Sequence, residues 1–240
     1  MIKEAQVIGA GAIGVVMGWF LARGGWSVDM VETKSSKLTA GRREGLELNG
    51  ERQVGGIHFE PFDCWTPKKG ALILLCVKTF DNAAVLERIN DKDLLPVQNG
   101  FDAGLEASAH LFEGIAAFVS ECDPHRPAAR ITRKGNLYLG SRTKSAIRRD
   151  GVAGELAGAL RAGGFERTRV VPFIGPFKSS KLMYNAAISP LAAAAGVDNG
   201  ELLRDPIARR LFFGLLRENY SILWRNRGWK TWWGPIAVVN

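Results

Sequence analysis

The sequence predicts an α/β protein with two domains, of which the second and smaller one is all-α. Three observations support this prediction. A glycine-rich turn links a strand pattern to a helix pattern near the start of the chain, strand and helix patterns then alternate as far as about residue 172, and only helix patterns follow. We therefore place a domain boundary between residues 172 and 173, which gives domains 1–172 and 173–240.

The first strand–helix–strand unit lies at the N-terminus. Residues 5–8 are predicted to form a short buried strand, and residues 15–22 have the length and apolar character of a helix. Gly24 and Gly25 follow that helix, where glycine commonly ends a helix. Residues 27–31 then form the second strand, which completes a βαβ unit.

The rest of the first domain continues the alternation. Residues 45–62 alternate in hydrophobicity around Asn49 and Gly50, which predicts a hairpin. Residues 71–77 form an unbroken apolar run, typical of a parallel strand buried on both faces. Further along we expect a helix at 82–89, a strand at 94–97, at least two strands within 115–140, a helix at 151–162 and a strand at 169–172.

The second domain is predicted to contain helices alone. The expected helices span residues 178–195, 199–203 and 206–227, and no strand pattern interrupts them.

Composition is ordinary for a soluble globular protein. Of 240 residues, 46% are hydrophobic and 23% are charged. No apolar run has the roughly 18 residues of a membrane span, and the N-terminus has no signal-peptide pattern, so we expect a cytoplasmic protein without a membrane partner. The three cysteines, Cys64, Cys76 and Cys122, form no CxxC pair, so no metal site is expected.

The formal net charge is +8, with 32 basic and 24 acidic residues. These basic residues are dispersed along the chain and are not interleaved with aromatic residues as in RNA-binding motifs. We therefore expect no nucleic-acid partner and favour small anionic or phosphate-bearing ligands.

The glycine-rich turn is the first candidate site. It fits the pattern GxGxxG between a strand and a helix, which identifies a Rossmann-type dinucleotide-binding domain. In this pattern Gly9 makes the tight turn, Gly11 lets the backbone approach a pyrophosphate, and Gly14 lets the helix pack closely on the strand. A glycine turn without a ligand is the alternative. The candidate cofactor-binding residues of the turn are Gly9, Ala10, Gly11, Ala12, Ile13 and Gly14.

The end of the second strand bears on the choice between NAD and NADP. Glu32 stands there, where a carboxylate accepts a hydrogen bond from the ribose 2′-hydroxyl and repels a 2′-phosphate. Four cations follow closely, however, and could pair with that phosphate: Lys34, Lys37, Arg42 and Arg43. They could equally form a solvated helix face. Both Glu32 and Lys34 are candidate cofactor-binding residues, and the sequence leaves the choice open.

Two more candidates follow predicted strands of the sheet. Lys78 comes directly after the buried strand 71–77, and Asn99 comes directly after strand 94–97. Ligands of open parallel sheets bind beyond the carboxyl ends of the strands, so both side chains are expected to line the cofactor cleft. The alternatives are a surface lysine and a turn residue before Gly100.

The third candidate group lies on the first helix of the second domain. Lys181, Asn185 and Ser189 are spaced four residues apart and therefore share one face of that helix. A polar stripe on an otherwise apolar helix favours contact with a polar ligand, although a solvated edge would also explain it.

These motifs together resemble the ketopantoate reductase (2-dehydropantoate 2-reductase) family. The resemblance covers nearly the whole chain, and its last two segments are the most specific. It rests on the glycine turn 9–14, on CVKTFD at 76–81, on PVQNG at 96–100, on KLMYNAAISPL at 181–191 and on DNGEL at 198–202.

The resemblance implies NADPH-dependent reduction of 2-dehydropantoate to pantoate in pantothenate biosynthesis. It implies that Lys181 is the catalytic proton donor, that Lys78 and Asn99 face the cofactor and the substrate carbonyl, and that Asn185 contacts the substrate. Ser189 stands where the family usually has a second asparagine, and it is a candidate substrate contact. A preorganised donor to a developing oxyanion, the role implied for Lys181, contributes roughly 3–4 kcal/mol of transition-state stabilisation.

Two further differences from the family affect these expectations. Thr33 follows Glu32 where many members carry an arginine for the 2′-phosphate, so NAD is not excluded as the cofactor. The sequence ends at Asn240, whereas members usually continue with helices that carry a substrate-binding serine and glutamate, so the all-α domain is expected to be truncated.

The alternatives to a ketopantoate reductase are a reductase of another 2-oxo acid and a dinucleotide-binding sensor that has lost catalysis. The partner expected in the first two cases is a small 2-oxo acid. The resemblance leaves a monomer or a homodimer open, with the helical domain as the interface.

Overall fold

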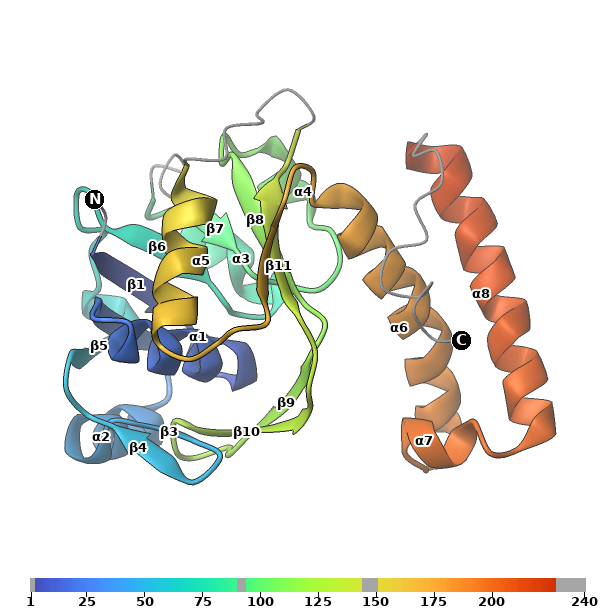
Figure 1. Cartoon of the computed structure of the whole chain (residues 1–240), viewed down its shortest axis with the longest axis horizontal. Helices are drawn as coiled ribbons and strands as arrows, with labels where there is room; N and C mark the ends of the chain where they lie inside the picture. The colour runs from blue at the N-terminus through green and yellow to red at the C-terminus, as the bar shows by residue number, and fades with distance from the viewer. Residues whose placement is uncertain (1–2, 90–93, 144–150, 228–240) are drawn as a thin grey trace. The chain divides into compact units, whose positions relative to one another are not determined.

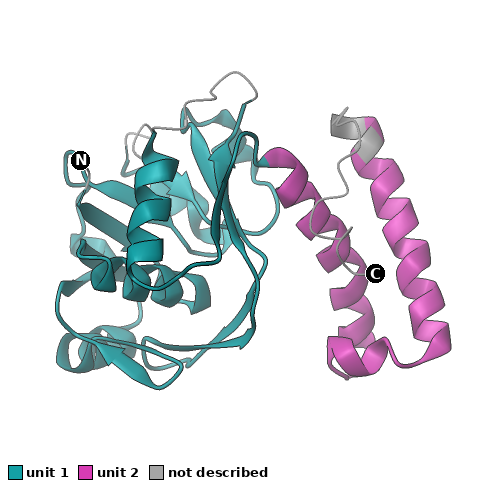
Figure 2. Ribbon diagram, viewed as in Figure 1, with its two compact units in different colours: residues 1–174 teal, residues 175–240 magenta. Residues whose placement is uncertain are grey.

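The structure is a computed structural model that describes residues 3–89, 94–143 and 151–227. The chain divides into two compact units, residues 1–174 and residues 175–240 (Figure 2). This division lies two residues beyond the boundary drawn from the sequence, 172 against 174.

A parallel sheet of five strands forms the centre of the first unit (Figure 1). Its strand order is β5-β2-β1-β6-β7, and every neighbouring pair is parallel. The strands are β1 Glu4–Ile8, β2 Ser27–Glu32, β5 Ile57–Pro61, β6 Leu72–Leu75 and β7 Leu94–Pro96. All four residues of β6 are buried, because the strand lies between β1 and β7 as its unbroken apolar sequence predicts. The predicted α/β class is therefore confirmed.

Helices cover this sheet. The long helix α1, Ala12–Arg23, has eight buried residues and packs beside α5, Val152–Ala162, as Figure 1 shows. The shorter helices are α2 Ser35–Glu44, α3 Asn82–Leu86 and α4 Ala103–Ala107, with 3₁₀ turns at Phe62–Cys64 and Thr79–Asp81. Apolar side chains of α1, α5 and the strands form one continuous core. This core fixes the start of α1 against the end of β1, where the glycine turn lies.

Two smaller sheets complete the first unit. One has the order β4-β3-β10-β9 and the other β12-β11-β8. Their strands are β3 Leu46–Leu48, β4 Glu51–Gln53, β8 Phe112–Ala116, β9 Val119–Cys122, β10 Ala128–Arg133, β11 Leu137–Ser141 and β12 Thr168–Val171.

The predicted hairpin at 45–62 is only partly correct. Strands β3 and β4 pair antiparallel around Asn49 and Gly50, whose φ angles of +53° and +88° suit a tight two-residue turn. Strand β5 leaves the hairpin and pairs in parallel with β2 instead. The alternating pattern of residues 57–61 gave the correct strand but not its partner, because pairing across the chain depends on non-local contacts.

The second unit consists of three helices in the part of it that the structure describes. They are α6 Gly175–Ala195, α7 Asn199–Leu202 and α8 Pro206–Arg227. Helices α6 and α8 lie side by side around a small apolar cluster, in which the rings of Tyr184 and Phe212 meet edge to face at a centroid distance of 5.5 Å. The all-α prediction is confirmed for residues 175–227, and the tryptophan-rich tail 228–240 lies outside the described residues.

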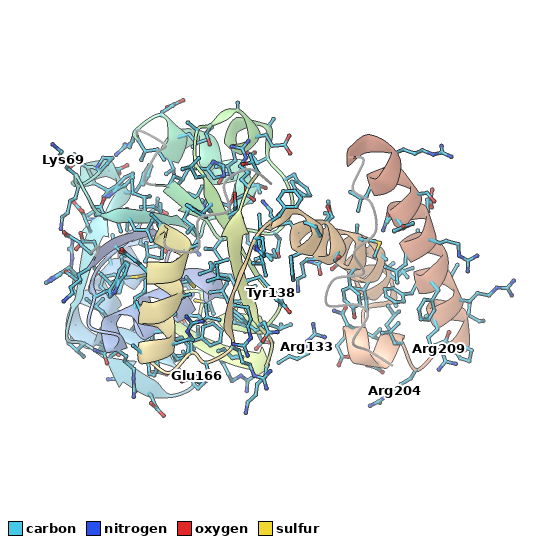
Figure 3. The ribbon with its side chains drawn as sticks, turned by 45° about the horizontal axis from the view of Figure 1, so that its top comes forward. Lys69, Arg133, Tyr138, Glu166, Arg204 and Arg209 are labelled. Carbon is cyan, nitrogen blue, oxygen red and sulfur yellow. The ribbon has the colours of Figure 1, made fainter. Side chains whose placement is uncertain are left out.

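Basic side chains project from separate positions on each unit. Lys69 and Arg133 are exposed on the first unit, and Arg204 and Arg209 are exposed on the second (Figure 3). Within residues 3–89, 94–143 and 151–227, no helix combines the length and hydropathy that crossing a membrane requires.

Candidate functional site

A cleft of about 540 Å³ opens at the carboxyl ends of four parallel strands in the first unit. This volume is within the range of about 300–1,000 Å³ that is common for small-molecule and cofactor sites. The ends of β1, β2, β6 and β7 contribute its walls, as expected for an open parallel sheet. Among its lining residues are Gly9, Gly11, Ala12, Ile13, Glu32, Thr33, Lys34, Lys37, Cys76, Val77, Lys78, Gln98 and Asn99.

The glycine turn has the geometry that a pyrophosphate requires. Gly9 has a φ of +96°, a conformation that residues with a side chain rarely adopt. A Cβ on Gly14 would lie 1.9 Å from the carbonyl oxygen of Gly9, so α1 packs directly on the turn. A Cβ on Gly11 would meet nothing within 4 Å, because that position faces open space at the cleft. The turn thus fits a dinucleotide phosphate at the N-terminus of α1.

Two side chains hold the backbone of this turn at Ala10. The amide N–H of Ala10 donates to Oε2 of Glu32 at 3.0 Å. The ammonium of Lys37 donates to the carbonyl oxygen of Ala10 at 2.7 Å and to Sγ of Cys122 at 3.3 Å. Lys37 is only 6% exposed, so its ammonium is buried and bonds to groups of the protein itself. Two predicted cofactor residues of the turn, Ala10 and Gly14, are not among the residues that line the cleft.

Lys78 and Asn99 lie on neighbouring segments of the cleft wall, after β6 and β7 respectively. Both residues are exposed. The segments are joined by Asn82 and Gln98, two buried amide side chains that bond to each other in both directions at 2.8 and 3.2 Å. Gln98 also donates to the carbonyl oxygen of Val77 at 2.7 Å. The pair fixes the two strand ends against each other.

Cys76 directly follows β6 and lines the cleft. Burial raises the pKa of its thiol from an ordinary value near 9 to about 12, so the sulfur stays protonated at neutral pH. A protonated thiol is a poor nucleophile, so we assign Cys76 no nucleophilic role in the cleft that it lines. In the described part of the chain no three His, Cys, Asp or Glu side chains form a group suited to a metal ion.

The structure brings most of the predicted cofactor residues together in the cleft of the first unit. Lys181, Asn185 and Ser189 belong to the second unit, where α6 is continuous through all three and carries them at four-residue intervals. Their assigned roles stay predictions. No local sequence signal marks Asn82 or the inward position of Lys37, since each depends on a partner at least 16 residues away.

The parallel sheet, the glycine turn and the cleft beyond the strand ends define the dinucleotide-binding α/β class of proteins. Comparison with known families is more specific. A family model described as "Ketopantoate reductase PanE/ApbA" matches residues 5–144, more than half of the chain, and the C-terminal model of that family matches residues 176–230. The chain belongs to the ketopantoate reductase family. It is thereby an oxidoreductase of the NAD(P)-dependent type that acts on CH–OH groups.

Individual relatives are distant. A 2-dehydropantoate 2-reductase of Archaeoglobus fulgidus is 23% identical over 211 residues, covering 85% of this chain and 68% of the relative. A 2-dehydropantoate 2-reductase of Halobacterium salinarum is 26% identical over 244 residues, covering 90% of this chain and 73% of the relative.

A solved structure with the same fold is the ternary structure of D-mandelate dehydrogenase with NADH and anilino(oxo)acetate. Its TM-score is 0.77 at 18% identity, with 91% of this chain and 73% of that chain covered. At this identity the similarity concerns the fold.

Proposed function

We propose that this protein reduces 2-dehydropantoate to pantoate with a nicotinamide dinucleotide, as a step of pantothenate biosynthesis. The observation that carries the proposal is the cleft itself, which combines a pyrophosphate-binding turn with Lys78 and Asn99 at the ends of adjacent strands. Membership of the ketopantoate reductase family and the names of the relatives agree with this reaction. The resemblance favours NADPH, whereas Glu32 in the cleft favours NADH.

In this proposal the chain has three tasks. The glycine turn at the head of α1 binds the pyrophosphate through backbone N–H groups that have no partner within the helix. Lys78 and Asn99 orient the reacting end of the cofactor and the substrate carbonyl. When bound, the reduced nicotinamide supplies the hydride that converts the ketone to an alcohol.

Lys181 is the proposed proton donor of the reaction. Reduction of a ketone places negative charge on its oxygen, and an ammonium group stabilises that charge and supplies the proton. Asn185 and Ser189 follow Lys181 on the same face of α6, and in this proposal their polar groups bind the substrate.

The test is a coupled measurement of cofactor binding and cofactor oxidation with 2-dehydropantoate. We expect Lys181→Ala to lower kcat by about 10²–10³-fold, the effect of losing one preorganised donor to a developing oxyanion, while the Kd for the cofactor stays unchanged. Lys69→Ala is the matched control, because Lys69 is an exposed lysine that does not line the cleft (Figure 3). Full turnover by Lys181→Ala would refute its role.

The same assay separates the remaining alternatives. Turnover of another 2-oxo acid with a higher kcat/KM than that of 2-dehydropantoate would assign a different substrate. Tight cofactor binding with no turnover on any 2-oxo acid would favour a dinucleotide sensor.

A further inference from the structure

We propose that Glu32 makes this protein select NADH over NADPH. The inference rests on the proposed function and deepens it, because it names the cofactor and the residue that chooses it. Glu32 ends β2, lines the cleft and is half-buried there. A carboxylate at this position of the fold accepts from the 2′-hydroxyl of the adenosine ribose, the group that carries the extra phosphate in NADPH.

The hydrogen bonds of Glu32 show that its carboxylate is fixed in place. Oε1 accepts from the backbone N–H of Thr33 at 2.8 Å and of Lys34 at 3.0 Å. Oε2 accepts from the backbone N–H of Ala10 at 3.0 Å. The side-chain hydroxyl of Thr33 also donates to Oε1, at 3.2 Å. Three of these four donors are main-chain N–H groups, so the carboxylate is held in place between the glycine turn and the start of α2.

This arrangement leaves room for one more hydrogen bond. A carboxylate has about four acceptor sites, two on each oxygen. Oε1 accepts from the N–H groups of Thr33 and Lys34 and from the Thr33 hydroxyl, so its sites are used, whereas the single bond from Ala10 leaves one site on Oε2. A ribose hydroxyl is a donor that can use this remaining site. A phosphate dianion offers no donor and places two further negative charges beside the carboxylate.

The nearby cations do not reverse this preference, because they have other acceptors. Lys37 is buried and bonds to the carbonyl oxygen of Ala10 and to Cys122. Arg42 donates to the carbonyl oxygen of Phe59 at 3.3 Å, and Arg43 pairs with Glu44. Neither arginine lines the cleft.

Lys34 is the remaining cation that lies close to Glu32 in sequence and lines the cleft; the other exposed lysine of the cleft, Lys78, follows β6. Lys34 is exposed, and its ammonium donates to the carbonyl oxygen of Pro124 at the long distance of 3.5 Å. An exposed lysine of this kind contributes little to the binding of an anion compared with a fixed, half-buried carboxylate that repels it. Lys34 is therefore the residue to test against Glu32.

The experiment compares the dissociation constants of NADH and NADPH for the full chain in the absence of substrate, by titration calorimetry. We expect NADH to bind at least about tenfold more tightly than NADPH. In Glu32→Gln the negative charge is lost, and the ratio of the two dissociation constants should approach one. Glu166→Gln is the matched control, since Glu166 is exposed on the turn after α5 and does not line the cleft (Figure 3).

A second variant keeps the test decisive if Glu32→Gln is unstable. Lys34→Gln should change the ratio of the two dissociation constants by less than about threefold, because it keeps the backbone N–H that bonds to Glu32 and removes only an exposed ammonium with one long hydrogen bond. Equal binding of both cofactors by the unchanged protein, or a large loss of NADPH binding in Lys34→Gln, would overturn the proposal. Tight NADH binding without turnover would overturn only the proposed reaction, and binding of neither cofactor would overturn both.

Discussion

Gly11 and Gly14 are three residues apart in the same turn, yet a methyl group would meet different surroundings at each. At Gly14 it would collide with the backbone of Gly9, which cannot move without opening the turn. At Gly11 it would enter open space on the cleft side, and the φ of −83° at Gly11 is acceptable for alanine. Stability and ligand binding are therefore separable within one motif.

We expect Gly14→Ala to lower the free energy of unfolding by about 3 kcal/mol, because overpacking against rigid backbone cannot be relieved by a side-chain movement. Gly11→Ala should leave that free energy nearly unchanged but weaken cofactor binding at least about tenfold, since the methyl group occupies the approach of the pyrophosphate. Urea unfolding and calorimetric titration measure the two effects. Normal cofactor binding by Gly11→Ala would show that the pyrophosphate lies elsewhere.

The roles of these glycines could be predicted from the sequence, whereas the role of Lys37 could not. The spacing of the glycines between a strand and a helix is a local signal. Lys37 looks like one of several cations on a helix surface, but its ammonium reaches Ala10 and Cys122, which are 27 and 85 residues away along the chain. Such contacts exist only once distant segments have packed together.

The elements that form the cleft depend on one polar connection between two strand ends. Strands β6 and β7 are paired through residues 73–75 and 94–96, and the segments that follow them lead into α3 and α4. After the strands end, hydrogen bonds between the side-chain amides of Asn82 and Gln98 connect the two segments, and Gln98 also donates to the carbonyl oxygen of Val77. The positions of Lys78 and Asn99 follow from this connection.

We expect Gln98→Ala to lower the free energy of unfolding by about 2 kcal/mol, because it leaves the buried amide of Asn82 without its partner. It should also raise the KM for cofactor or substrate, since the segments that carry Lys78 and Asn99 are no longer fixed. Gln53→Ala is a suitable control, because Gln53 lies on the β3–β4 hairpin and its side-chain amide donates to the nearby carbonyl oxygen of Gly55. Equal losses in the two variants would contradict the positioning role of Gln98.

Helices and strands whose local hydrophobic pattern indicates their burial were predicted correctly. The apolar run of β6 and the helices of the second unit belong to this group. The partner of β5 and the two small sheets could not be predicted, because β10 pairs with β3 across about 80 residues of chain and no local pattern encodes that choice.

The residues of the candidate cofactor cleft and the proposed proton donor belong to different units of the chain. Every residue that lines the cleft belongs to the unit of residues 1–174, whereas Lys181 belongs to the unit of residues 175–240. The first unit also has its own continuous core, and on that ground we expect it to fold without the helices that follow.

We therefore expect a fragment of residues 1–174 to fold and to bind the cofactor within about threefold of the full chain's Kd, since the cleft is complete within it. The fragment should show no turnover, because it lacks the proposed proton donor.

Full-length Lys181→Ala is the matched comparison, since it removes the same ammonium group and keeps every helix. If the fragment folds, as judged by circular dichroism and a cooperative unfolding transition, but binds no cofactor, then residues after 174 contribute to the cofactor site. If both proteins bind the cofactor and neither turns over, the cleft of the first unit is sufficient for binding and Lys181 is needed for the reaction.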